Sequence, residues 1–251
     1  MKNLILSITT ALCALTCTAN AETIEKNINI RDFCRIELNG SDKVIYTQGE
    51  SYSVTVKAEK EDIDKVEISK EGETLYIQSK NSVNISRGFF DFIHDIMNGT
   101  VNDQNADITI YVTSPDLIGV SVVGSGDFKS NEKVDTDNLS ITIKGSGDID
   151  FNDIICDNVN VQLAGSGDVN IKSIESIIAN YELRGSGDIK VNQQRVKATD
   201  LLVVGSGDIE VRCNDCELVN ANVTGSGDIR IKGNIKNLNK NVRGSGDISV
   251  N

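Results

Sequence analysis

Apolar and polar residues alternate along most of this chain. In the first half, segments with apolar side chains two residues apart lie at 36–38, 44–46, 54–56, 66–68, 75–77 and 107–112. A period of two places those side chains on one face of a β-strand. The pattern predicts a series of short strands, each with one buried face. After Pro115 the same alternation becomes far more regular.

The regularity comes from a tandem repeat. The tetrapeptide Gly-Ser-Gly-Asp occurs seven times at spacings of 19 to 21 residues, beginning at Gly124, Gly145, Gly165, Gly185, Gly205, Gly225 and Gly244. A fixed period of this size is the signature of a repeat architecture, in which each unit packs only on its neighbours. Glycine allows positive φ or close backbone approach, so the motif is expected to form a sharp corner.

Apolar columns flank every corner. Two residues before each motif stand Val122, Ile143, Leu163, Leu183, Val203, Val223 and Val242. Directly after each aspartate stand Phe128, Ile149, Val169, Ile189, Ile209, Ile229 and Ile248. A unit of about 20 residues cannot bury such faces alone, whereas stacked copies can. The sequence predicts an all-β protein: a right-handed β-helix or solenoid with turns of about 20 residues, preceded by a less regular β-lobe.

The expected organisation has three parts. Residues 1–21 form a signal peptide, 22–118 an N-terminal β-lobe with an insertion at 88–104, and 119–251 the repeat solenoid, with 22–251 forming one continuous domain. Gly40-Ser41-Asp42 looks like a degenerate corner of the same kind. In the last turn, Lys240 replaces the apolar residue found four positions before the other motifs. That charge looks like a cap on an open edge, although end-to-end pairing of two copies stays open.

The first residues read as an export signal. Lys2 precedes an apolar run from Leu4 to Leu15, and Ala19-Asn20-Ala21 fits a cleavage site. The alternative is a lipoprotein acylated at Cys17. The expected location is therefore the periplasm or the cell surface. No second stretch has the ~20 apolar residues of a spanning helix.

Charge excludes some partners. The formal net charge is −12, and removal of residues 1–21, whose only charged side chain is Lys2, makes it −13. An acidic chain is a poor candidate for binding nucleic acid or anionic lipid.

Four cysteines follow the predicted signal: Cys34, Cys156, Cys213 and Cys216. The last two form an isolated CxxC, and a structural zinc site would need two further ligands. His94, the single histidine, lies in a different segment. A local disulfide or two free thiols, burial as small apolar residues, and redox chemistry all stay open for this pair.

The repeated aspartates are the most conspicuous candidate for chemistry. Stacking places one carboxylate per turn in a column made of Asp127, Asp148, Asp168, Asp188, Asp208, Asp228 and Asp247. Neighbouring carboxylates at this spacing repel one another, so something must offset the repulsion. In the structural interpretation, each aspartate accepts hydrogen bonds from corner amides. In the functional one, pairs of aspartates bind Ca²⁺, the one cofactor that we consider.

An apolar cluster interrupts the first half of the chain. It comprises Phe89, Phe90, Phe92, Ile93, Ile96 and Met97. These residues are expected either to pack over the solenoid or to form an exposed patch that binds a partner, for which they are our candidate residues.

The chain resembles the family described as putative auto-transporter adhesin, head GIN domain, over roughly residues 30–251. The seven corners, Ile-Glu-Leu-Asn-Gly at 36–40, Val-Ile-Tyr-Thr-Gln-Gly at 44–49 and Ser-Pro-Asp-Leu at 114–117 carry the resemblance. It implies an exported β-helical protein, without catalytic residues to carry over, that adheres to a protein or glycan of the envelope or a host surface. The function expected is a non-enzymatic adhesion or structural module. The alternatives are a periplasmic scaffold or ligand-binding protein, a calcium-binding repeat protein and a polysaccharide-active enzyme.

Overall fold

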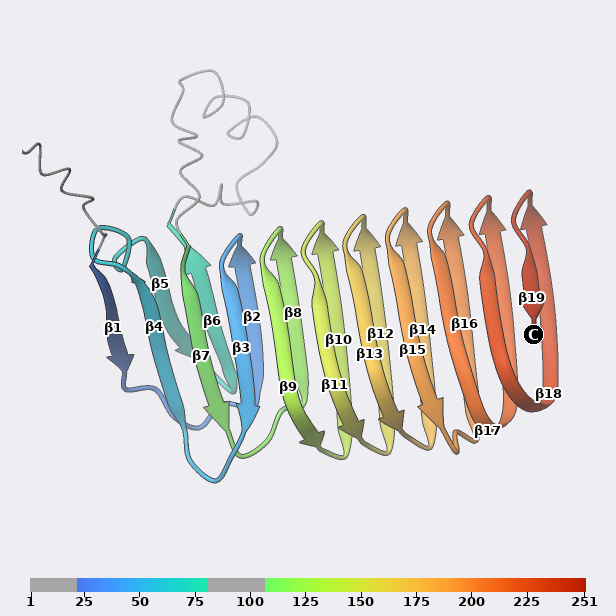
Figure 1. Cartoon of the computed structure of the whole chain (residues 1–251), viewed down its shortest axis with the longest axis horizontal. Helices are drawn as coiled ribbons and strands as arrows, with labels where there is room; N and C mark the ends of the chain where they lie inside the picture. The colour runs from blue at the N-terminus through green and yellow to red at the C-terminus, as the bar shows by residue number, and fades with distance from the viewer. Residues whose placement is uncertain (1–21, 81–106) are drawn as a thin grey trace, which may run out of the picture.

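A computed structural model describes residues 22–80 and 107–251 of the protein. The predicted signal peptide, including Cys17, and the predicted insertion with its apolar cluster at 89–97 lie outside these residues. The described part contains nineteen strands and no helix, and they stack side by side into a long body (Figure 1). The predicted all-β solenoid, with turns of about 20 residues after a less regular N-terminal part, is confirmed.

Two ladders of parallel strands form the regular stack, one on each side of the glycine corner. Strands that enter the corner are β8 (Gly119–Gly124), β10 (Asn138–Gly145), β12 (Asn158–Gly165), β14 (Ile178–Gly185) and β16 (Ala198–Gly205). Strands that leave it are β9 (Asp127–Asp135), β11 (Ile149–Ile155), β13 (Asp168–Glu175), β15 (Asp188–Gln194) and β19 (Ile248–Val250). The long strands β17 (Asp208–Gly225) and β18 (Ile229–Gly244) join both ladders.

The core lies between the two ladders. In the two predicted columns, every residue except Val242 is buried, as the alternation predicts. The register keeps each column aligned, with Ile143 opposite Val122 and Leu163, and Ile189 opposite Val169 and Ile209. Apolar side chains at equivalent positions therefore cover one another from turn to turn.

Close backbone approach explains both glycines of the motif. Gly185 has φ +138°, and a Cβ placed there would lie 2.1 Å from the carbonyl oxygen of Gly165. A Cβ on Gly187 would lie 1.9 Å from the carbonyl oxygen of Gly167. The corner carbonyl is also an acceptor, because Gly165 O receives the N–H groups of Ser186 at 2.9 Å and Gly187 at 3.3 Å. Any side chain at either glycine would push successive turns apart.

One turn of the stack is out of sequence order. Strands β2 (Arg35–Gly40) and β3 (Lys43–Gln48) pair with β8 and β9 on one side, and with β6 (Thr74–Ser79) and β7 (Thr109–Ser114) on the other. Gly40 lies opposite Gly124 and has φ +132°, which confirms the degenerate corner. Strands β2 and β3 thus precede their four neighbours in the sequence but lie between them in the sheet.

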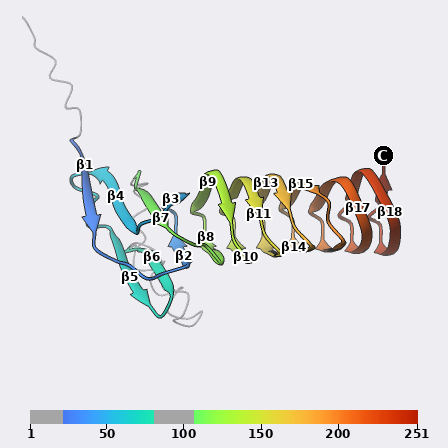
Figure 2. The same ribbon diagram turned by 90° about the horizontal axis from the view of Figure 1, so that it is seen from below.

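Beyond β6 and β7 the two ladders separate, and the pairing changes to antiparallel. Strand β5 (Val66–Glu71) pairs with β6, while β4 (Ser53–Glu59) pairs with β7 and β1 (Thr23–Ile28) with β4. Figure 2 shows β1 and β4 diverging from β5 and β6, whereas the regular turns stay closely stacked. Among residues 22–80 and 107–251, no strand closes the space between these two groups, so the N-terminal end of the described part is open.

At the opposite end, the last turn carries charged side chains, and the predicted cap stays a prediction. The Lys240 ammonium donates to the carbonyl oxygen of Ile248 at 2.9 Å, across the turn. Val242 and Val250 are each 41% exposed there, in contrast to the buried residues of earlier turns. Charged and exposed side chains replace the continuous core where the repeat stops.

Candidate functional site

The aspartate column is used by the backbone of the stack. The Oδ1 atoms of Asp148, Asp168, Asp208 and Asp228 each accept the N–H of the aspartate one turn further on, at 2.9 to 3.0 Å. A carboxylate that accepts a backbone N–H is stabilised in its charged form. These contacts are the ones that the structural interpretation expects.

Basic side chains offset part of the repulsion between these carboxylates. Arg230 spans two turns, with its Nη1 atom 2.7 Å from Asp208 Oδ2 and its Nη2 atom 2.9 Å from Asp228 Oδ2. Partial burial raises the pKa of Asp208, but hydrogen bonds from Arg230 and the Asp228 N–H outweigh it and hold that pKa below its ordinary value. Lys190 pairs with a single aspartate of its own turn, with its Nζ atom 3.0 Å from Asp188 Oδ2.

The geometry around the column offers little to a metal ion. In residues 22–80 and 107–251, no group of three or more His, Cys, Asp or Glu side chains is arranged to hold one. The aspartate column brings one carboxylate per turn, with one oxygen of several of them already hydrogen-bonded. A calcium role for this column stays a prediction.

One aspartate differs from the rest because it is buried. Asp42 is 5% exposed, and its Oδ2 accepts the hydroxyl of Ser79 at 2.6 Å. Its carbonyl accepts the N–H of Asp127, and Gly126 lies against it, so Asp42 occupies the place that the second glycine takes in later corners. Burial raises its pKa, while the Ser79 hydrogen bond opposes that shift. Ser79 lies opposite Gly40, where later turns have the first glycine of the motif, and its hydroxyl reaches the Asp42 carboxylate from there.

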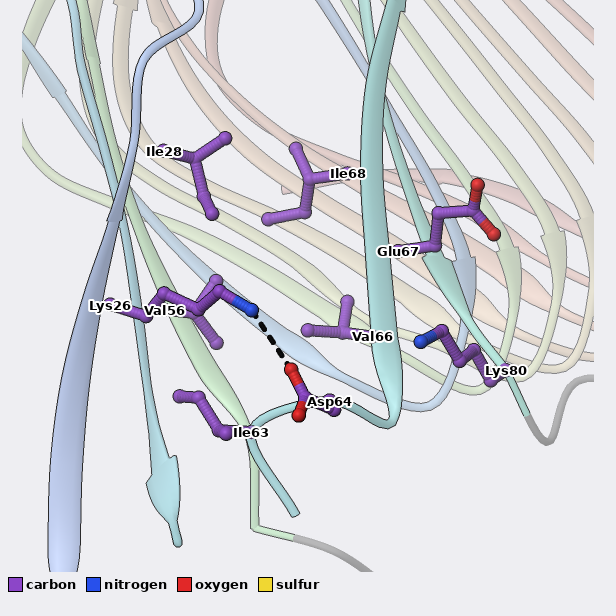
Figure 3. A pocket seen from close by; sticks show the side chains of 9 residues that line it. All are labelled: Lys26, Ile28, Val56, Ile63, Asp64, Val66, Glu67, Ile68 and Lys80. Atoms are coloured by element: carbon purple, nitrogen blue, oxygen red, sulfur yellow. Dashed lines mark hydrogen bonds and ion pairs between the residues drawn. The ribbon is translucent and has the colours of Figure 1, made fainter.

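The open N-terminal end contains a pocket of about 360 Å³ between β1, β4 and β5 (Figure 3). Its apolar lining consists of Ile28, Val56, Ile63, Val66 and Ile68. Val56 is buried, and Ile28 and Ile68 are half-buried at the margin of the core. A volume of this size falls in the range of small-molecule sites.

Charges of both signs stand around this pocket. Lys26 from β1 donates to Asp64 Oδ1 at 2.8 Å, and Figure 3 shows this pair between the apolar residues. The hydrogen bond from Lys26 is the main reason that the pKa of Asp64 lies below its ordinary value. Glu67 and Lys80 complete the lining. The pocket therefore combines apolar side chains with two acidic and two basic ones.

The CxxC lies in the core of the stack. Cys213 and Cys216 are 4% and 0% exposed, and both sulfur atoms lie near the side-chain amide of Gln193. Tyr181 is fully buried in the neighbouring column, and its hydroxyl has no hydrogen-bond partner among the described residues. The structure therefore brings the two predicted thiols together inside the protein.

A family model decides the relationship to known proteins. The model described as putative auto-transporter adhesin, head GIN domain, matches residues 32–235. The chain belongs to this family. The head GIN match runs from β2 into β18, so it covers the out-of-order turn and most of the repeats. A search of curated proteins finds no match.

Solved structures support the same fold. The chain is similar to a putative adhesin from Bacteroides fragilis, with 25% identity and a TM-score of 0.75 over 92% of this chain and 97% of that one. A putative lipid binding protein from Parabacteroides distasonis has 24% identity and a TM-score of 0.69, with 92% and 98% coverage. A putative adhesin from Parabacteroides merdae has 18% identity and a TM-score of 0.63, with 92% and 97% coverage.

Neither the head GIN family nor these structures are described as enzymes. Within residues 22–80 and 107–251, no helix is long and apolar enough to cross a membrane. The association with adhesins points to a surface or extracellular setting in general terms.

The pocket is the part of the site that the sequence did not predict. Its lining comes from four separate segments, and only the separation of the ladders brings them together. The predicted partner-binding residues at 89–97 lie in the segment between β6 and β7, outside the described residues. Lys80, at the end of that segment, lines the pocket.

Proposed function

We propose that this protein is a non-enzymatic, exported module of the cell envelope that adheres to, or structurally supports, a protein or glycan at the surface. The observation that carries the proposal is the contrast between the two parts of the molecule. The stack uses its repeated polar groups to hold its own backbone, whereas the N-terminal end is open and presents a pocket. Membership of a family described as putative adhesins supports the same interpretation.

The stack is suited to displaying that end away from an attachment point. Each added turn extends the body by about 4.8 Å while burying its apolar column on the turn before. Corner carbonyls and aspartate oxygens are paired within the stack. In this proposal the repeats act as a spacer, and the partner binds at the N-terminal end or at the apolar segment predicted at 88–97.

The first experiment separates a surface module from a periplasmic scaffold. Intact cells are treated with a membrane-impermeant amine reagent, and labelling of this protein is compared with that of a periplasmic marker. We expect labelling of this protein without labelling of the marker. Protection in intact cells, with labelling after outer-membrane permeabilisation, would favour the scaffold.

The second experiment locates the binding surface. Purified protein is incubated with isolated envelopes and with glycan arrays, alongside a variant that lacks residues 87–104 and the variant Ile68→Glu. Ile178→Glu serves as the control, because Ile178 is likewise a strand isoleucine with its side chain outside the core but lies in the stack. We expect binding to survive the control and to fall in at least one of the other variants.

A second candidate function is the binding of a small apolar or amphiphilic ligand. Its specific support is the 360 Å³ pocket with an apolar lining and balanced charges, together with a structural neighbour named a putative lipid binding protein. Displacement of a fluorescent fatty acid tests it. Saturable binding that Ile68→Glu abolishes and Ile178→Glu preserves would support it, and no saturable binding would exclude that ligand class.

A further inference from the structure

The corner that carries the CxxC has a conformation that brings two inward-facing positions together. It lies within β17, between the part that pairs with β15 and the part that pairs with β16. Asp215 has φ +61°, a left-handed conformation that tightens the turn between the cysteines. The equivalent corner one turn earlier has the same feature at Arg195, with φ +55°. There, Gln193 and Val196 occupy the inward positions that Cys213 and Cys216 occupy here, and all four are buried.

The two sulfur atoms share one polar environment. Gln193 Nε2 lies 3.3 Å from Cys213 Sγ and 3.1 Å from Cys216 Sγ, and it donates to Thr199 Oγ1 at 2.7 Å. The two thiols are also hydrogen-bonded to each other. The hydrogen bond from Cys213, with those from Gln193 and the Val196 N–H, lowers the pKa of Cys216 and favours its thiolate.

We propose that Cys213 and Cys216 form an intramolecular disulfide in the exported protein. The oxidant is a disulfide compound, either oxidised glutathione or the active-site disulfide of a thiol oxidoreductase. The Cys216 thiolate attacks one sulfur of that oxidant, which releases a thiolate and leaves a mixed disulfide. Cys213 then loses its proton and attacks Cys216 Sγ, releasing the second thiol. The two cysteines lose two electrons and two protons, and the oxidant is reduced to two thiols.

The remaining described cysteines are poorly placed to compete. Cys156 shares an inner column with Cys216, but three turns separate them, a distance of about 14 Å that exceeds the reach of a disulfide. Cys34 lies in the N-terminal part, with its thiol 3.7 Å from Glu73 Oε2. The CxxC is thus the pair that the fold brings into contact.

The burial of Cys213 and Cys216 determines when the disulfide can form. The next turn covers this corner, with Gly233 opposite Cys213 and Ile235 opposite Cys216. Oxidation therefore has to precede the docking of β18, and the folded protein should resist both reduction and alkylation. This part of the inference rests on the proposed export, because an oxidising compartment supplies the reaction.

The test is thiol counting by mass spectrometry. Protein secreted by its own signal is denatured in excess alkylating reagent, with and without prior reduction. We expect two alkylated cysteines before reduction, Cys34 and Cys156, and four afterwards. The peptide that spans 213–216 should be lighter by two hydrogens before reduction. A Cys34→Ala, Cys156→Ala variant should keep that difference, and Cys213→Ala, Cys216→Ala should lose it.

A refolding experiment tests the pairing of the two cysteines independently of export. Reduced, unfolded protein is refolded in a glutathione redox buffer, and the same peptide is analysed. Formation of the bond in the buffer but not in cells would support the pairing and contradict the proposed location. Failure in both, or bonding of either cysteine to Cys34 or Cys156, would overturn the inference. Closing so short a loop should raise the melting temperature by about 4–8 °C relative to reduced protein.

Discussion

The regular stack and the N-terminal end solve the same problem, the burial of one apolar face, in different ways. In the stack, each turn finds an identical turn on either side, so a corner carbonyl or an aspartate oxygen always meets the same partner. At the N-terminal end the neighbours differ from one another, and pairing becomes antiparallel. Where the turns repeat, their apolar faces are fully covered. Where the repeat ends, the strands separate and leave a pocket.

The contrast extends to individual corners. Gly187 faces another glycine carbonyl and admits no side chain, whereas the equivalent place in the out-of-order turn holds Asp42, hydrogen-bonded to Ser79. A corner can therefore hold a functional group only where the turn beneath it is not a copy of itself. We therefore expect side chains that bind a ligand or partner at the boundary of the repeat. Within the repeats, the corner keeps the same backbone conformation from turn to turn.

The largest effect should come from filling a corner in the stack. Gly187→Ala places a Cβ 1.9 Å from the Gly167 carbonyl oxygen, so we expect a loss of at least about 3 kcal/mol in unfolding free energy. Gly72→Ala is the control, because its Cβ meets nothing within 4 Å and the cost comes only from φ +58°, about 1–2 kcal/mol. Urea denaturation of both variants measures the difference. Equal losses would mean that turn-to-turn approach does not limit the corner.

Removal of the hydroxyl group from two buried tyrosines should change the stability of the protein in opposite directions. The Tyr46 hydroxyl lies 3.1 Å from Ser114 Oγ, while that of Tyr181 has no partner among the described residues. Tyr46→Phe should cost about 1 kcal/mol, and Tyr181→Phe should stabilise the protein by a similar amount, because it removes an unpaired buried group. Thermal and urea unfolding check both. A loss in both variants would show that Tyr181 has a partner, such as a buried water.

The buried aspartate makes stability depend on pH. Burial raises the pKa of Asp42 from its ordinary value of 3.8, so the folded state disfavours its charged form. Above the raised pKa this charge lowers stability, and the penalty vanishes as the pH falls below 3.8, where both states are protonated. Asp42→Asn should therefore raise the melting temperature at pH 7 and leave it unchanged near pH 3.

Asp247→Asn provides the control for that experiment, because Asp247 is exposed at the last corner. A similar pH-dependent gain in both variants would assign the effect to the net charge of −12 instead of the buried site.

A smaller effect is expected from the aspartate column. Asp168→Asn keeps an oxygen that accepts the Asp188 N–H and removes one charge from the column, so its stability should stay within about 0.5 kcal/mol of the native protein. Asp168→Ala removes the acceptor and should cost about 1 kcal/mol. Urea denaturation at low and high salt separates the two contributions. Equal losses in both variants would show that the charge itself is required.

Calcium should have the smallest effect. Because aspartate oxygens already accept backbone N–H groups, we expect melting temperatures with calcium and with chelator to agree within about 1 °C, a shift too small to reflect specific binding. Differential scanning calorimetry measures this directly. A rise of several degrees that Asp168→Asn reduces would restore the calcium interpretation.

The repeat made the stack predictable from sequence. Apolar residues two positions apart, repeated from turn to turn, predicted the strands. The seven Gly-Ser-Gly-Asp motifs predicted the corners. The degenerate corner at Gly40 was also recognisable, because its neighbours keep the alternation. These features are local, and a single chain displays them directly.

The remaining features depend on contacts between distant residues. Strand spacing alone does not reveal that β2 and β3 lie between β6/β7 and β8/β9, or that β1, β4 and β5 turn antiparallel. The polar residues around the CxxC could have been recognised in the sequence. Gln193 and Thr199 interrupt columns held by Ile174 and Ala179 one turn earlier, and Tyr181 stands between Val161 and Leu201. Such exceptions in otherwise aliphatic columns would have located the interior cluster.

The out-of-order turn also determines how the protein can assemble as its chain is delivered from the N-terminus onward. Residues 35–48 cannot find both neighbours until the chain has been delivered through β9, which ends at Asp135. From that point each further repeat can dock as soon as it appears, because its only partner is already in place. The first half must therefore wait unfinished while the second half folds almost without delay, so the interval most exposed to proteases and misassembly falls before the repeats arrive.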